Sequence, residues 1–232
     1  AGMAVAALRA VKSGEELDLL RKAAAIAEAG GRAGISAIAA GIAEHEIATA
    51  ATGAMARAVA TVFPWVAVTE SWAWFQSGIN TDGSHSPATN KVIRSGEILG
   101  LRCCPSVFGY LASVGRTLFC DHADMASLAV WETNVAVHRR GLDLVRPGGR
   151  CNEIALELND MYRRAGLLQF RAAGYGHALG LMGQHFGREA GTELREDFDT
   201  VLQAGMVVTM APMLMLPVGR DGAGGYREQD ML

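Results

Sequence analysis

One short pattern occurs twice along the chain and restricts its fold more than any other feature. GIAEHEIA at 41–48 and GGRCNEIA at 148–155 share the pattern G-x-x-x-x-E-I-A. In both places a helical pattern precedes the motif, a second helix begins within it, and strand-like runs follow. A repeat of this length indicates a duplicated half-domain and not a solenoid. The sequence therefore predicts an α+β domain with pseudo-twofold halves, in which helices cover a curved antiparallel sheet.

Capping and turn residues set the expected element boundaries. Ser13 and Glu16 form a capping box, and we expect the helix that follows to end at Gly30–Gly31. The next helix begins near Glu44 and ends at Phe63–Pro64. Further helices are predicted over 124–145 and 152–165, and strands near 65–75, 97–104, 107–120, 171–182, 206–216 and 226–232.

The composition is that of an ordinary globular protein. The 232 residues are 50% hydrophobic and 19% charged, with a formal net charge of −3. No basic run indicates a nucleic-acid partner, and no apolar stretch is long enough to span a bilayer. The four cysteines lack C-x-x-C spacing, so we expect reduced thiols in a cytoplasmic protein. We interpret residues 1–232 as one domain, and the abrupt ends as those of a trimmed chain.

Several polar residues occur where a cleft is expected. His85 lies in FQSGINTDGSHSP after a strand, and His177 lies in AGYGHALG, whose glycines allow close backbone approach. Arg188 is either an anion anchor or the partner of Glu189, and Glu228 follows a glycine-rich bend. The strand-like runs LGLRCCP, GYLASVGRTLF and VVTMAPML carry no carboxylate, which argues against a metal site.

Long blocks of the chain resemble the creatinase family. These blocks are WAWFQSGINTDGSHSP, GRTLFCDH, NVAVHRRGLDLVRPGGRC, GYGHALG, GREAG, ELREDFDT and GAGGYREQD, and the similarity runs from about residue 12 to the end. The resemblance implies the pita-bread fold that this family shares with aminopeptidase P, prolidase and methionine aminopeptidase. It also implies a smaller N-terminal domain that this chain lacks.

The resemblance assigns roles to individual residues. It implies that His85 is a metal-independent proton shuttle, that His177 borders the substrate, and that Arg188 holds a substrate carboxylate. Glu228 matches the last carboxylate of the family's YRE block, and Phe75 is placed with the substrate-binding residues.

The departures from the family pattern concern charged positions. Glutamates that hold a guanidinium in creatinase are replaced by Gly115 and Ala211, and the histidine after YRE is replaced by Gln229. The metal-dependent relatives use two Asp, one His and two Glu. Their two Asp positions match Arg102 and Ser113, and one Glu position matches Ala211. Of the five ligands, only His177 and Glu228 remain. We therefore expect no metal and no other cofactor.

Two classes of function remain open. The first is a hydrolase, which we interpret as an engineered creatinase domain in preference to a naturally diverged one, in which Cys104 is the nucleophile, His85 or His177 the base, and Arg102 a neighbouring cation. Strand alternation places Arg102 and Cys104 on one face and Cys103 on the other, although the interpretation that Cys104 only fills space is favoured. The second is a non-catalytic small-ligand-binding domain or pseudoenzyme. A small molecule is the expected partner in either case, and a homodimer is possible.

Overall fold

Paired helices and short antiparallel strands make up the chain in a computed structural model that describes residues 2–66, 71–83, 86–181 and 191–232. The helices are α1 (Gly2–Ala10), α2 (Gly14–Ala37), α3 (Glu44–Val62), α4 (Met125–Leu144) and α5 (Cys151–Arg164), with short 3₁₀ turns η1 (Gly78–Asp82) and η2 (Leu168–Phe170). The strands are β1 (Trp72–Ser77), β2 (Ile98–Cys104), β3 (Ser106–Val107), β4 (Tyr110–Leu111), β5 (Val114–Phe119), β6 (Thr209–Met210), β7 (Met213–Leu216), β8 (Gly224–Arg227) and β9 (Asp230–Met231). The predicted α+β class is confirmed.

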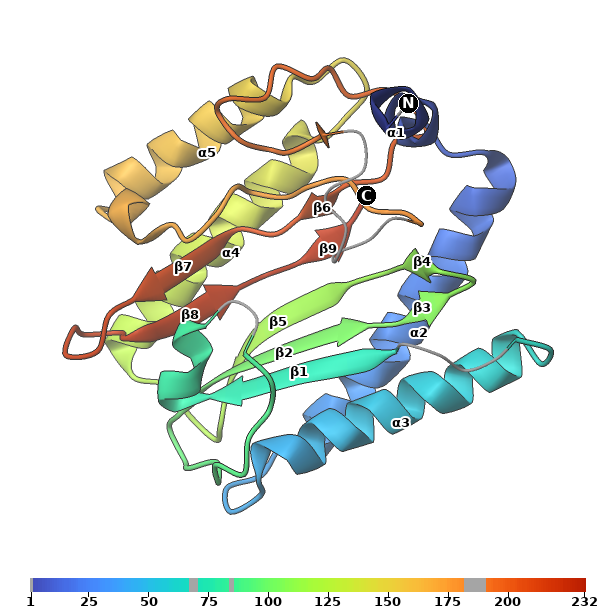
Figure 1. Ribbon diagram of the computed structural model, residues 1–232. Coiled ribbons are helices and arrows are strands. Elements are labelled where there is room, and N and C mark those ends of the chain that lie inside the picture. The colour runs from blue at the N-terminus through green and yellow to red at the C-terminus, as the bar shows by residue number, and fades with distance from the viewer. Residues whose placement is uncertain (1, 67–70, 84–85, 182–190) are drawn as a thin grey trace.

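The first half builds its own hydrophobic core. Strands β1, β2 and β5 form an antiparallel sheet in that order, and α2 and α3 pack against one face of it (Figure 1). Fully buried side chains from the helices and the sheet meet between them, including Ile47, Met55, Phe75 and Leu99. The amphipathic helices are therefore held by the apolar face of this sheet.

The second half repeats this arrangement with shorter strands. β7 pairs with β8 and β6 pairs with β9, all antiparallel, and α4 and α5 cover them at the other end of the layer of strands (Figure 1). A second core forms here around Leu158, Tyr162, Tyr175 and Leu214. Each half thus buries its own apolar surface.

In the described part of the chain, a β-bridge between Gly115 of β5 and Gln229, which follows β8, joins the two sets of strands. The N–H of Gly115 donates to the carbonyl of Gln229 at 3.0 Å, and the N–H of Gln229 donates to the carbonyl of Gly115 at 2.9 Å. This antiparallel bridge continues the register in which Arg102 lies opposite Gly115. Arg102, Gly115 and Gln229 consequently occupy one row across the sheet, on the same face.

The hydrogen bonds around the two motifs confirm the duplication. At the first residue of α3, the N–H of Glu44 donates to the carbonyl of Lys91 at 3.0 Å. At the first residue of α5, the N–H of Cys151 donates to the carbonyl of Thr200, also at 3.0 Å. The partner segments also resemble each other: VIRSG at 92–96 and VLQAG at 201–205 both end in a glycine with positive φ, +81° at Gly96 and +88° at Gly205. This second echo was missed in the sequence.

Some expected boundaries differ from the structure. The capping box at Ser13 begins α2 as predicted, but the helix continues past Gly30 and Gly31 to Ala37. Gly30 and Gly34 lie on the side of α2 that touches α3 and β2, and added Cβ atoms there would lie 2.5 Å from Met55 Cγ and 2.9 Å from Leu101 Cδ2. These glycines allow close helix packing, and tertiary contact overrides their low helix propensity.

Two further expectations need correction. Helix α1 was not predicted from the sequence. At its C-terminal end, Lys12 Nζ donates to the carbonyls of Arg9 and Ala10. The expected strand near 171–182 is represented in the described residues by isolated bridges of Arg171, His177 and Ala178. None of the helices in the described part combines the length and apolar character needed to cross a membrane.

The neighbouring glycines of α2 give a matched test of this packing. Gly31→Ala should stabilise the protein by up to about 1 kcal/mol, because its added methyl group meets nothing within 4 Å and alanine favours the helix. Gly30→Ala should destabilise it by about 1–3 kcal/mol, because its methyl group would crowd Met55 and the carbonyl of Ala51. Urea unfolding of both variants measures the difference, and equal effects would contradict the close approach of α2 and α3.

Candidate ligand-binding cleft

Alternation along the strands separates the site from the core. Leu101 and Cys103 of β2 belong to the core under α2 and α3, whereas Arg102 between them lies on the opposite face beside Trp74. Phe75 is fully buried on the core side, so its predicted substrate contact is wrong. Its neighbours Trp74 and Gln76 face the cleft instead, because successive side chains of a strand point to opposite faces.

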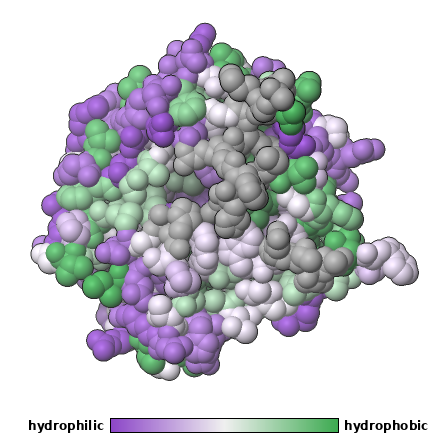
Figure 2. All heavy atoms as spheres, in the orientation of Figure 1, coloured by the Kyte–Doolittle hydropathy of each residue, from purple (hydrophilic) through white to green (hydrophobic). Residues whose placement is uncertain are grey.

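The cleft lies on the face of the sheet away from α2 and α3. The strand-bearing face of the molecule is hollowed near its centre (Figure 2). The described residues that line the cleft come mainly from β1, β2, β5, β7 and β8, and none of them carries a carboxylate. They are Trp74, Gln76, Thr81, Gly100, Leu101, Arg102, Arg116, Met213, Gly225 and Arg227.

Arg102 is a buried cation among neutral neighbours. Arg102 is 5% exposed. Its Nε donates to Ser113 Oγ at 2.9 Å, and its guanidinium lies 5.2 Å from the centre of the Trp74 ring. A cation–π contact and one hydroxyl acceptor offset only part of the cost of removing a guanidinium from water.

Arg227 brings a second positive charge to the same cleft. Burial and, as the smaller cause, the neighbouring charge of Arg102 together lower the pKa of Arg227 to about 9. Its Nη2 contacts Met213 Sδ at 2.7 Å, and its backbone N–H donates to Thr117 Oγ1 at 2.7 Å. Among the described residues of the cleft, two cations therefore lie close enough to influence each other.

Glu228 points away from this cleft, so the prediction that it faces the cleft with His177 is wrong. Its Oε1 accepts from Trp131 Nε1 on α4 at 3.2 Å and from the N–H of Thr117 at 3.3 Å. Burial raises the pKa of Glu228, and these donors and Arg116 compensate only in part. Gln229 lies in the same row as Arg102 and Gly115 and on the same face of the sheet. Because successive residues of a strand point to opposite faces, Glu228 must face the helices.

Arg116 belongs to the same cluster behind the sheet. Its Nη2 donates to Asp230 Oδ1 at 2.7 Å, and its Nη1 donates to the carbonyls of Gly115 and Gln229. Asp230 Oδ2 also lies 3.2 Å from His138 Nε2. Burial opposes ionisation of Asp230, but bonds from His138 and Arg116 more than offset it and lower its pKa. The charge of Arg116 is therefore matched where it lies.

His177 lies in the second half, on the segment before β6. Its N–H donates to Thr209 Oγ1 at 3.0 Å, and its Nδ1 lies 2.9 Å from the carbonyl oxygen of Ala178. Gly176 beside it has φ +157°, and an added Cβ would lie 1.8 Å from the carbonyl oxygen of Thr209. Glycine is thus required for this close approach, as the GYGH motif indicated.

Cys104 shares the face of Arg102 as predicted, but it is inaccessible. It is 0% exposed, packs with Leu111 and Leu179, and its Sγ lies 3.3 Å from Ser113 Oγ. A substrate carbonyl cannot reach this sulfur without displacing the side chains above it. The burial favours the packing interpretation of Cys104 over the nucleophile.

His85 and Arg188 lie outside the described residues, but the flanks of His85 are firmly anchored. Gln76, which lines the cleft, donates through Nε2 to the carbonyls of Gly83 at 2.9 Å and Ser86 at 3.1 Å. Gly83 and Ser86 are therefore both held beside a cleft residue.

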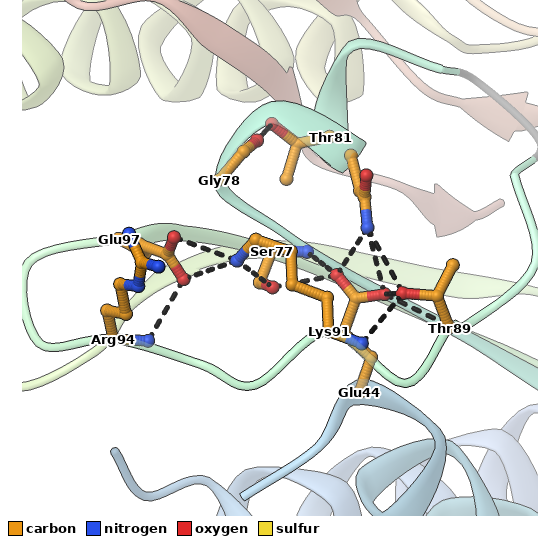
Figure 3. A network of polar contacts seen from close by, with 9 residues as sticks. Glu44, Ser77, Gly78, Thr81, Thr89, Lys91, Arg94 and Glu97 are labelled. Atoms are coloured by element: carbon orange, nitrogen blue, oxygen red, sulfur yellow. Dashed lines mark hydrogen bonds and ion pairs between the residues drawn. The ribbon is translucent and has the colours of Figure 1, made fainter. Parts of the chain in front are cut away.

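The buried carboxylate of Glu44 fixes the wider loop (Figure 3). It accepts hydrogen bonds from Ser77, Asn80 and Thr89, with backbone N–H donors at Ser77 and Thr89. Lys91 Nζ then joins Ser77 Oγ to Glu97. The network ties the start of α3 to the end of β1 and to the residues on both sides of the 78–89 loop.

The donor set of the cleft does not suit a divalent metal ion. In the described ranges no group of three or more His, Cys, Asp or Glu is placed to hold one. Arg102 and Ser113, at the positions that resemble the relatives' aspartates, bond to each other, and Glu228 faces α4. A guanidinium at such a site repels a dication.

Comparisons with known proteins agree with this fold. The model of metallopeptidase family M24 matches residues 18–232. The chain belongs to the M24 family. It is 50% identical over 229 residues to a creatinase from Bacillus sp. (strain B-0618), covering 99% of this chain and 56% of that protein. It is 24% identical over 229 residues to a Xaa-Pro dipeptidase from Pyrococcus furiosus, covering 96% and 60%.

Solved structures of M24 members show the same pita-bread fold. A prolidase from Pyrococcus furiosus superimposes with a TM-score of 0.86 at 22% identity, over 98% of this chain and 63% of that one. An X-Pro aminopeptidase from Thermotoga maritima gives 0.84 at 20% identity, over 98% and 60%. The resemblance to the creatinase family is confirmed, and the chain spans less than two thirds of each of these relatives.

Sequence reasoning missed Trp74, Gln76 and Arg227 as cleft residues. The available signal was the period-two alternation of strands. If Arg102 faces the cleft, so do Trp74 opposite it and Gln229 in the same row, whereas Phe75 and Glu228 cannot.

Glu44→Gln should destabilise the protein by about 2–4 kcal/mol at pH 7, because an amide NH₂ would replace an oxygen that accepts from several donors. Burial alone would raise the pKa of Glu44, but the hydrogen bonds lower it overall from 4.5. The stabilisation is thus present above pH 4.5 and lost as the pH falls through the folded-state pKa. Thermal unfolding from pH 7 to 3 should show the two proteins converging in acid, whereas the exposed control Glu132→Gln should show no such trend.

The thiols of the native protein should react slowly. All four cysteines are buried, and burial raises the pKa of Cys103 to about 12 and that of Cys151 to about 11. Titration with an aromatic disulfide at pH 8 should release little product until denaturant exposes the chain. One fast-reacting thiol that is lost in Cys104→Ala and kept in Cys103→Ala would restore the nucleophile hypothesis.

Proposed function

We propose that this chain is a small-molecule-binding domain of the M24 family that does not hydrolyse creatine and takes no divalent metal in its cleft. The observation that carries the proposal is the charge of the cleft. Its described lining contains Arg102 and Arg227 and no carboxylate, while the third lining arginine, Arg116, pairs with Glu228 and Asp230 behind the sheet. The guanidinium group of creatine is a cation, and it would meet like charge where binding needs opposite charge.

Position 115 illustrates the point. An added Cβ on Gly115 would lie 3.8 Å from Arg102 Cγ and 3.6 Å from Arg227 Cδ, so this residue lies between the two cations. A glutamate here would bring a carboxylate between them and could accept a guanidinium, whereas glycine adds no charge at this position. Glu228 cannot substitute for it, because its carboxylate contacts α4.

The thiol-hydrolase hypothesis is the weaker alternative. Cys104 is linked to Arg102 through Ser113, but its complete burial opposes access of a substrate. We therefore assign Cys104 to packing and keep the binding function.

We also favour natural divergence over an engineered origin. Half of the aligned positions differ from the creatinase relative, over 229 residues. Remodelling of a pocket changes a limited set of positions near it, whereas differences along the whole chain are what drift under a conserved fold produces. The cytoplasmic location and a homodimer stay predictions.

Creatine assays test the proposal. The protein should release no urea above the uncatalysed background over a range of creatine concentrations, with a full-length creatinase as the positive control. Each missing charge partner is expected to cost on the order of 2–5 kcal/mol of binding. Urea release that disappears in His177→Ala would overturn the proposed function. Release unaffected by that substitution would point to a contaminating enzyme and would require repeat measurement on repurified protein.

A further inference from the structure

We propose that a second cavity, between the two halves of the chain, binds a small organic ammonium ion that carries an apolar substituent. The cavity has a volume of about 300 Å³, at the lower end of the roughly 300–1,000 Å³ that small-molecule sites occupy. Its described lining comes mainly from η1, the turn before β2, the start of α4 and the β7–β8 connection. It shares no described lining residue with the arginine-lined cleft, so the inference does not depend on the proposed function.

One wall of this cavity depends on a close contact between the two halves. The N–H of Gly225 on β8 donates to Thr81 Oγ1 of η1 at 2.9 Å, and an added Cβ on Gly225 would lie 1.8 Å from the carbonyl oxygen of Thr81. The turn η1 accordingly lies against β8 (Figure 1). Asp82 follows Thr81, Gly224 precedes Gly225, and both line the cavity. The fold thus positions this wall before any ligand binds, which lowers the cost of binding.

Charge sets the class of ligand. Three carboxylates line the cavity, those of Asp82, Glu97 and Asp124, and none of the described lining residues is a lysine, arginine or histidine. Lys91 Nζ contacts Glu97 Oε2 at 2.7 Å from outside the lining (Figure 3), so Glu97 is already compensated. The negative charge offered to a ligand therefore comes from Asp82 and Asp124.

Both aspartates can contact a cation. Asp124 caps α4, with Oδ1 accepting from the N–H of Ser127 at 2.8 Å and Oδ2 from Ser127 Oγ at 2.7 Å. These bonds lower the pKa of Asp124, so it is ionised at neutral pH, and each oxygen keeps a second lone pair for a donor. Asp82 is exposed, so a ligand can reach it from solvent.

Apolar side chains form much of the remaining wall. Ile98 and Leu216 are buried beside the cavity, whereas Ile79 is 61% exposed and Val218 is 69% exposed. Large apolar side chains that stay in contact with water beside one cavity mark a surface on which an apolar group can be buried. The site therefore offers a negative group and a hydrophobic wall to the same ligand.

This combination favours an organic cation over a metal ion. In the described ranges no group of three or more His, Cys, Asp or Glu is placed to hold a metal. A hard cation needs several oxygen ligands to replace its water, and apolar walls supply none. An alkylammonium ion instead keeps its charge at the carboxylates and buries its chain against Ile79 and Val218.

A ligand series on the unmodified protein tests the site without any substitution. In calorimetric titrations at constant ionic strength, affinity should rise from methylammonium through butylammonium to hexylammonium, by up to about fourfold for each buried methylene. Hexanol and hexanoate have the same chain without the positive charge, and they should bind roughly 10-fold or more weakly. No binding of hexylammonium, equal binding of hexanol, or equal affinity along the series would overturn the proposal.

A matched pair of charge variants locates the ligand. Asp82→Asn should weaken hexylammonium binding roughly 5- to 20-fold, because one charge-assisted contact is lost. Asp221→Asn, at an exposed aspartate of the β7–β8 connection that does not line the cavity, should leave it within about twofold. Equal loss in both variants would indicate attraction to the protein surface in general, and no loss in either would place the ligand elsewhere. Both results would overturn the site.

A third variant tests the apolar wall separately. Val218→Thr keeps the shape of the side chain and replaces a methyl group by a hydroxyl group. It should reduce the gain in affinity between methylammonium and hexylammonium and leave methylammonium binding unchanged. An unchanged gain would contradict burial of the chain against this wall.

Discussion

The pair of hydrogen bonds between Gly115 and Gln229 is the constraint on which the rest of the cleft depends. Each half of the chain folds around its own hydrophobic core, so burial within a half does not fix how the strands of the two halves meet. The antiparallel bridge does fix it, and through the period-two pleat it also fixes which side chains share a face. A slip by one residue would exchange Gln229 for Glu228 and reverse the charge of the cleft.

The same register sorts the charged residues into two environments. Behind the sheet, Glu228 and Asp230 are matched by Arg116, Trp131 and His138, so the buried carboxylates there have partners. On the cleft side, Arg102 has neutral contacts and lies near Arg227. Buried polar groups that are satisfied rigidify a fold, whereas those left unsatisfied mark a place for a ligand. Among the described residues, the two faces of the sheet therefore differ in charge.

Membership of the M24 family explains the scaffold but not the contents of its cleft. The fold is kept at 20–22% identity in solved relatives, because apolar cores and close helix contacts such as that of Gly30 tolerate many sequences. A binding site depends instead on a few side chains at fixed positions, and here those include Arg102 and Arg227. Shared fold and changed chemistry are therefore compatible.

Local sequence determined the elements of this protein. The capping box at Ser13 and the repeated G-x-x-x-x-E-I-A motif act through nearby backbone groups, so the helix starts and the duplication could be predicted without a structure. Only the tertiary structure decided that α2 continues through Gly30, that Phe75 and Glu228 face helices, and that Cys104 is covered by Leu179. These outcomes depend on strand register and on contacts between distant segments, and a single sequence specifies neither until the strands are paired.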